Sequence, residues 1–192
     1  MITRYPLFAL LAALIVAFSS CGKDETPKVE ESPFFSFFDE AAITIDTTPV
    51  AADTWEYGFV FNPLVDGQIT SLGLKLPVTG TFSVKLWNLD GGTRVILKEQ
   101  QITSATEHVP VFVDIPAVAV QKEAKLGITI LANSFYRLEK QNATDFSYPR
   151  VLKNIRIVSF NEETNTSGLA VFPETANSTR VAPCVNVIFI AD

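Results

Sequence analysis

The strongest constraint on the fold of this chain is an alternation of apolar and polar residues, with a period of two, between Tyr57 and Trp87. Three runs, residues 57–61, 72–76 and 82–86, show it. A period of two buries one face of a pleated strand and leaves the other face polar. The residues between the runs that reverse a chain or stop a helix are Asn62, Pro63, Asp66, Gly67, Pro77 and Gly80. The stretch therefore predicts an antiparallel three-stranded meander.

The rest of the chain favours strands as well. Phe occurs 15 times in 192 residues, and aromatic residues fit pleated surfaces. Further strands are predicted at residues 34–45, 95–102, 109–115, 118–120, 126–131, 155–160, 171–172 and 184–190. Residues 133–154, polar and aromatic, are predicted to be irregular. Short strands separated by turns, with no helical period, are typical of an all-β fold: a single antiparallel β-sandwich, immunoglobulin-like or jelly-roll-like, over residues 34–192.

The N-terminus has the pattern of an export signal. Residues 1–4 carry a positive charge, and residues 7–18 form an apolar segment too short to span a bilayer. The small residues before Cys21 resemble the lipobox of bacterial lipoproteins, although Phe18 stands where Leu is usual. The sequence thus predicts a lipoprotein signal peptide over residues 1–20 and lipidation of Cys21, which would anchor the chain to a membrane. The alternative is an ordinary secretory signal with an incidental cysteine.

Residues 21–33 are polar, acidic and interrupted by proline, so they predict a flexible tether between the lipid and the sandwich. Gly22 replaces the Asp that commonly retains lipoproteins at the inner membrane, which predicts an outer-membrane location. Lys23, Asp24 and Glu25 resemble the acidic signal that exports Bacteroidetes-type lipoproteins to the cell surface. Surface exposure is therefore a hypothesis, with a solvated spacer as the alternative.

Charge and motif content exclude several function classes. The net charge is −6 and the basic residues are scattered, so the sequence offers no positive stripe for nucleic acid. His108 is the single histidine, and no cluster has the spacing of a zinc site or of a calcium loop. We therefore predict no enzyme activity, no catalytic residues, no cofactor and no bound metal. A structural calcium at the turn residues Asp66 or Asp90 stays as an alternative.

Cys184 would be the one thiol left after lipidation of Cys21, so no intramolecular disulfide is expected. It stands at the start of a strongly apolar run, where a free cysteine behaves as a small hydrophobic residue. We predict that Cys184 is buried and inert.

Several short motifs are similar to a bacterial family called domain of unknown function 4082. They are residues 57–61, 66–72, 82–87, 116–120, 127–129 and 185–189, together with Tyr136. The resemblance implies a β-sandwich that serves as an accessory module in secreted and surface proteins, often beside carbohydrate-active domains. It implies no catalytic residues.

Aromatic side chains are the candidate ligand-binding residues. In the period-two pattern Trp87 points to the polar face, and sugar rings stack on exposed indoles. Tyr136, Arg137 and Tyr148 lie in the segment predicted to be irregular, where binding residues are common. The alternatives are that a loop covers Trp87 and that the tyrosines form a small core.

The sequence as a whole predicts a non-catalytic, lipid-anchored module of the cell envelope that binds a glycan or another extracellular matrix polymer. The alternative is a structural subunit that docks another envelope protein through an exposed sheet face or edge.

Overall fold

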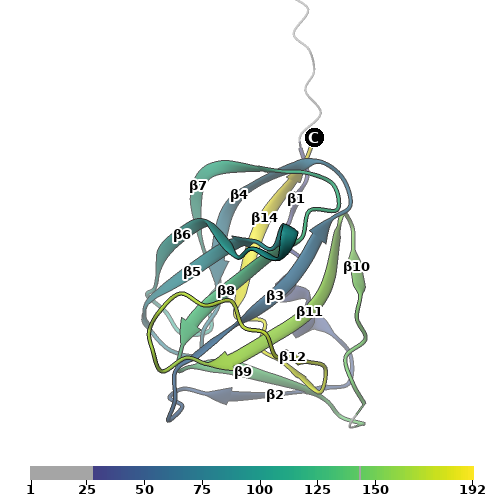
Figure 1. Cartoon of the computed structure of the whole chain (residues 1–192). Coiled ribbons are helices and arrows are strands. Elements are labelled where there is room, and N and C mark those ends of the chain that lie inside the picture. Colours follow the sequence, from purple (N-terminus) through teal and green to yellow (C-terminus); the bar gives the residue numbers. More distant parts are fainter. Residues whose placement is uncertain (1–27, 143) are drawn as a thin grey trace, which may run out of the picture.

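The computed structural model describes residues 28–142 and 144–192, and almost all of its regular structure is β-strand arranged in antiparallel sheets (Figure 1). The prediction of an all-β sandwich is confirmed. One main sheet has four strands in the order β1 (Glu30–Glu31), β14 (Val185–Ala191), β4 (Gly67–Leu74) and β7 (Val111–Val120).

The other main sheet has seven strands. Its order is β10 (Arg150–Leu152), β11 (Ile155–Thr164), β3 (Trp55–Pro63), β8 (Leu126–Ala132), β5 (Gly80–Asn88) and β6 (Val95–Ser104), with β12 (Ala176–Asn177) also paired to β11. A smaller sheet consists of β13 (Arg180–Val181), β9 (Phe135–Lys140) and β2 (Ile43–Thr48).

The predicted meander is wrong in its pairing, although its three strands are present. β3 pairs with β8 and β11, β4 pairs with β14 and β7, and β5 pairs with β6 and β8. The chain therefore changes sheet after β3 and again after β4. The reason is that one face of each strand is strongly apolar. When consecutive strands lie in opposite sheets, these faces meet in one core between the sheets, to which Phe59 and Leu72 both belong.

Residues 34–38 were predicted as strand, but Phe34–Asp39 is a 3-10 helix (η2) that follows Pro33. In a 3-10 helix residues i and i+3 lie on the same side. Phe34 and Phe37 consequently both enter the core, where their rings stack on Phe59 with centroids 4.6 and 5.5 Å away. Four phenylalanines within these six residues conceal this period of three.

The tether ends earlier than predicted, because the sandwich begins before Phe34. Glu30 and Glu31 form β1 and pair with Ile190 and Phe189 of β14. The buried Glu31 carboxylate accepts hydrogen bonds from the backbone N–H and the side-chain amide of Asn154, at 3.0 and 2.6 Å. Acidic composition suggested solvent exposure, but a distant asparagine satisfies this carboxylate. Residues 1–27, including the predicted signal peptide and Cys21, lie outside the described residues.

Residues 133–154 contain β9 and β10 and are more regular than predicted. In β9, Tyr136 and Leu138 are buried while Arg137 is exposed, so the strand does alternate, but with too many polar residues to stand out. Val118–Val120, predicted as a separate strand, continues β7 through a register shift against β4.

Candidate functional site

The outward face of the seven-stranded sheet carries an unusual row of polar positions. The strand registers place Glu99, Lys85, Thr129, Gly58 and Asn161 side by side across β6, β5, β8, β3 and β11. Alternation explains their direction, because the neighbours of these residues, such as Val84 and Ile130, face the core. Lys85, Thr129 and Asn161 are nevertheless buried, so something covers this face.

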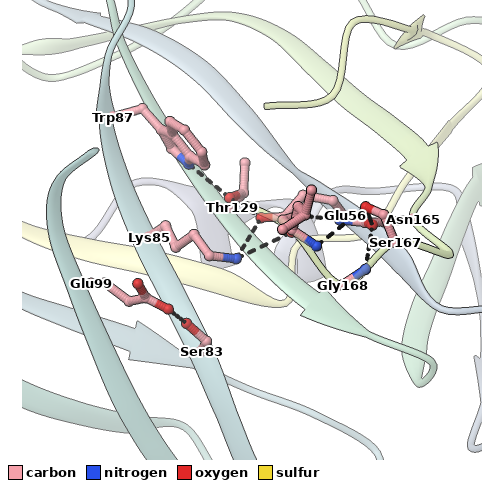
Figure 2. Close-up of polar contacts among 10 residues, drawn as sticks. Glu56, Ser83, Lys85, Trp87, Glu99, Thr129, Asn165, Ser167 and Gly168 are labelled. Carbon is pink, nitrogen blue, oxygen red and sulfur yellow. Dashed lines mark hydrogen bonds and ion pairs between the residues drawn. The ribbon is translucent and has the colours of Figure 1, made fainter. Parts of the chain in front are cut away.

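A connected polar network lies at the centre of the row (Figure 2). The Trp87 indole Nε1 donates to Thr129 Oγ1 at 2.8 Å, and Thr129 Oγ1 donates to Glu56 Oε1 at 2.5 Å. Lys85 Nζ donates to both oxygens of the same carboxylate at 3.2 Å. Each donor thus finds an acceptor: Lys85 and Thr129 bind Glu56 directly, and Trp87 is linked to it through Thr129.

Burial and the hydrogen-bond partners of Glu56 act on its pKa in opposite directions. Burial raises the pKa of the Glu56 carboxyl above its usual value, while the Thr129 hydroxyl and the Lys85 ammonium oppose that rise. A carboxylate that accepts three hydrogen bonds, one from an ammonium group, is consistent with an ionised Glu56 that holds its neighbours in place. Its oxygens are already engaged, which makes Glu56 a structural anchor in this conformation.

The cover is a loop of residues 165–175, called here the covering loop. Its buried Phe172 packs edge-on against Trp87, with ring centroids 5.8 Å apart, and joins Val60 and Leu89 in a small apolar cluster separate from the main core. Gly127 makes room for it, because a Cβ at that position would lie 2.3 Å from Phe172 Cε2. Residues 171–172 were predicted as strand but lie in this loop.

Hydrogen bonds fix the covering loop at both ends. At its start Asn165 is buried, accepts from the Ser167 hydroxyl and the Gly168 N–H, and donates to the Leu169 carbonyl (Figure 2). Near its end the Asn161 amide donates to the carbonyls of Pro173 and Glu174 at 3.3 and 3.2 Å. The loop is therefore an ordered part of this surface.

A pocket of about 350 Å³ opens beside Phe172; we call it the Phe172 pocket. Buried or half-buried apolar side chains of Val60, Leu89, Val158 and Phe172 contribute to its lining. The polar lining residues are Arg94, Lys125, Ser159, Asn161 and Glu174. Arg94 forms an ion pair with Glu174 and also donates to the Phe172 carbonyl. Lys125 is exposed and has no ion pair within residues 28–142 and 144–192.

A second pocket, of about 190 Å³, shares Pro173 with the Phe172 pocket as a lining residue. Glu56 and Glu163 line it together with Asn165, Thr166 and Ser167 of the covering loop and its base. Val171 and Pro173 also line this pocket, and its carboxylate Glu56 is engaged by Lys85.

The structure does not assemble the four predicted ligand-binding residues into one site. Trp87 is 2% exposed and is covered by Phe172, so the predicted stacking surface is absent. The structure agrees with the alternative, in which a loop covers Trp87. Tyr136 is 4% exposed: its ring packs edge-on against Phe38, its backbone N–H donates to Cys184 Sγ, and it does not present a free ring face either.

Arg137 and Tyr148 have different surroundings. Arg137 is exposed and pairs with Glu139, at the side of an open hollow over β2 and β9. Tyr148 is half-buried near Phe37, and its buried hydroxyl has no hydrogen-bond partner among the described residues. Burial raises the pKa of the Tyr148 phenol. No ring contact or hydrogen bond of the described chain joins Trp87 to the other three.

Two other predicted features can be placed. Cys184 is fully buried, as predicted, and burial raises the pKa of its thiol to about 12. His108 lies exposed in a turn, where its Nδ1 is 2.7 Å from the Tyr136 hydroxyl. Within the residues that the structure describes, no group of three or more His, Cys, Asp or Glu is placed to share a metal ion. None of the helices in that part of the chain is long and apolar enough to cross a membrane.

Sequence reasoning missed Glu56, Thr129, Asn161 and Phe172. The pattern did carry one signal: Lys85 stands beside Trp87 on the same face of a strand, and a covered Trp implies that a neighbouring lysine is covered too. The carboxylate partner is 29 residues away in the sequence and could not be identified from spacing.

No protein-family model matches the chain, and comparisons with curated proteins and with solved structures give no significant match. The resemblance to domain of unknown function 4082 therefore stays a prediction.

Proposed function

We propose that this protein is a non-catalytic module of the cell envelope, anchored to the outer membrane by a lipid on Cys21, that binds a glycan in the Phe172 pocket. The observation that carries the proposal is the composition of that pocket, whose lining combines apolar side chains with cationic, carboxylate, amide and hydroxyl groups. Its volume of about 350 Å³ falls within the range of small-molecule sites in proteins.

This lining suits a sugar because a sugar ring has apolar C–H faces and a rim of hydroxyl groups. Hydroxyls can donate to Glu174 and accept from Arg94 and Lys125, while Val60 and Phe172 contact the C–H faces. Burial of Trp87 removes aromatic stacking from the proposal and shifts recognition to polar contacts. Asn161 holds the loop that forms one wall, so the pocket is ordered before a ligand binds, which reduces the entropy cost of binding.

The chemistry of the face supports binding without catalysis. Glu56, the buried carboxylate of the network, is fully engaged by Thr129 and Lys85 and is not free to transfer a proton.

The test is a glycan-array screen of the lipid-free chain with Cys21→Ser, followed by calorimetry on any polysaccharide that binds. Lys125→Ala should weaken binding by about tenfold to a hundredfold, because hydrogen bonds to charged groups contribute about 1.5–3 kcal/mol. Lys122→Ala is the matched control, since Lys122 is equally exposed but does not line the pocket. The proposal would be contradicted if no glycan on the array bound the protein. It would also be contradicted if a glycan bound but neither Arg94→Ala nor Lys125→Ala weakened its binding.

One observation favours the alternative of docking to another envelope protein. β2 pairs only with β9 among the described strands, and its residues Thr44, Ile45, Asp46 and Thr47 are exposed. An open strand edge can accept a strand from a partner. A photo-crosslinking residue at Ile45 should then capture one defined envelope protein in cells, whereas the same residue at the exposed Leu97 should not.

A further inference from the structure

We infer that one end of the sandwich is held facing lipid headgroups, so that the edge of β2 points away from the membrane. The inference rests on the proposed lipid anchor at Cys21. It follows from where the fold begins, because the length of chain between the lipid and the first fixed residue limits how the domain can turn.

The N-terminal segment is fixed to the sandwich by several independent contacts. β1 pairs with β14, Glu31 is buried against Asn154, and Ser32 Oγ accepts from the Asn186 amide at 2.7 Å. Lys28 adds an exposed ion pair to Asp192 at 3.7 Å. Within the described residues, the chain is therefore fixed to the sandwich from Lys28 onward.

Further hydrogen bonds show which other residues lie at the same end of the sandwich as Lys28. The Asp192 N–H donates to the Asp66 carbonyl, the Lys122 N–H donates to the Asp66 carboxylate, and the Leu64 N–H donates to the Asn154 carbonyl. We call this the Lys28 end: Lys28, Asp66, Lys122, Lys153 and Asp192. Figure 1 shows β1 and the C-terminus together at this end, with β2 and β9 at the opposite end.

The available chain length decides the orientation. Lys28 is seven residues after Cys21, and seven fully extended residues span at most roughly 25 Å. A domain of this size is roughly 40 Å across. A connection shorter than the domain keeps the Lys28 end near the bilayer and prevents the domain from turning over so that only the far end faces the membrane. Had the fold begun at Phe34, the connection could have spanned about 45 Å, enough for the domain to turn over.

The chemistry of the Lys28 end fits a headgroup surface. Its exposed side chains include Lys122 and Lys153 as well as Asp66 and Asp192. Mixed charges of this kind favour contact with polar headgroups over insertion into the hydrocarbon layer. The hollow over β2 and β9, with Arg137 beside it, is consequently presented to the surroundings of the membrane.

The experiment uses the full chain, purified from membranes and reconstituted in phosphatidylethanolamine–phosphatidylglycerol vesicles. A fluorophore is attached either at Lys122→Cys or at Thr47→Cys on β2, both of which are exposed. Cys184 is fully buried, so labelling is confined to the introduced thiol once Cys21 carries lipid. Energy transfer to an acceptor on the lipid headgroups should be several-fold greater from position 122 than from position 47. An insertion of twenty Gly/Ser residues after Thr26 should remove most of that difference.

Three failures are distinguishable. Mass spectrometry that finds no lipid on Cys21 would overturn the proposed anchor and this inference with it. A lipidated chain with equal transfer from the two positions, or greater transfer from position 47, would overturn the orientation alone. Greater transfer from position 122 that the inserted linker leaves unchanged would show that another contact sets the orientation, and would overturn the tether argument.

Discussion

The Lys85 ammonium lies 3.2 Å from both carboxylate oxygens of Glu56, and the two residues are 3% and 1% exposed. Pairs buried this completely gain Coulomb energy but lose the hydration of two charges, and their net contribution to stability is often small. Removal of one partner is different, because it leaves an uncompensated charge in the interior. The pair also fixes Thr129 and, through it, the Trp87 indole.

The first prediction follows from this asymmetry. Lys85→Met should reduce the free energy of unfolding by about 3–5 kcal/mol, and Glu56→Leu should cost about as much. The double variant should cost clearly less than the sum of the two, because neither charge is then left alone. Urea unfolding of the four proteins measures the coupling. Additive costs in this cycle would show that the two side chains do not interact.

Trp87 gives the second prediction. Trp87→Ala should lower the free energy of unfolding by about 3–5 kcal/mol, because it removes a buried indole that contacts Phe172 and leaves the Thr129 hydroxyl without its donor. Arg137→Ala is the contrast, since the exposed pair of Arg137 with Glu139 should be worth less than about 1 kcal/mol. Thermal unfolding of both variants checks this. An unchanged melting temperature for Trp87→Ala would mean that the indole is exposed after all.

The third prediction concerns two glycines in neighbouring strands. A Cβ at Gly58 would lie 1.8 Å from the Ile128 carbonyl oxygen, which belongs to the backbone of β8 and cannot yield without breaking the sheet. A Cβ at Gly127 would meet mainly the Phe172 ring, which can move outward. Gly58→Ala should therefore prevent folding.

Gly127→Ala should fold at a cost of about 1–3 kcal/mol, with faster proteolysis within the covering loop. Circular dichroism and limited proteolysis test the pair of substitutions. A folded Gly58→Ala, or a Gly127→Ala whose covering loop is as resistant to protease as that of the parent, would contradict these close contacts at the two glycines.

Period-two alternation was sufficient to predict the three strands between Tyr57 and Trp87, but not their partners. Residues 57–61 and 72–76 look equally apolar, and nothing local says that β3 and β4 belong to opposite sheets. Alternation also assigned Lys85 and Trp87 correctly to one face, because that depends on the strand alone. What covers the face depends on Phe172, some 85 residues later, and on the small size of Gly127. Contacts of that range are set by the whole fold.

The same limit explains the errors at the N-terminus. Composition marks residues 21–33 as unable to form a core, which is true of these residues alone. Glu31 becomes ordered because Asn154 and the edge of β14 offer it partners. Likewise, the aromatic run from Phe34 has high strand propensity, yet Phe59 provides a surface that two rings three residues apart can share.

The last prediction concerns alkaline pH. Burial raises the pKa of the Cys184 thiol to about 12 from 9.0, and burial raises the pKa of Tyr136 to about 12 from 10.0. Both groups keep their protons longer in the folded state than in the unfolded state. The stability that they contribute is therefore fully present below about pH 9 and is lost as the pH rises toward 12. Each group can contribute a slope of up to about 1.4 kcal/mol per pH unit in this interval.

Denaturation of the Cys21→Ser chain at several pH values measures the effect, with Cys184→Ala in the same background as the control. The free energy of unfolding should fall between pH 9 and 11, and less steeply in the Ala variant, because one of the titrating groups is gone. At pH 8 the folded chain should not react with a thiol reagent, whereas the chain in urea should react fully. Rapid reaction of the folded chain, or equal slopes in the two proteins, would show that Cys184 is accessible to solvent.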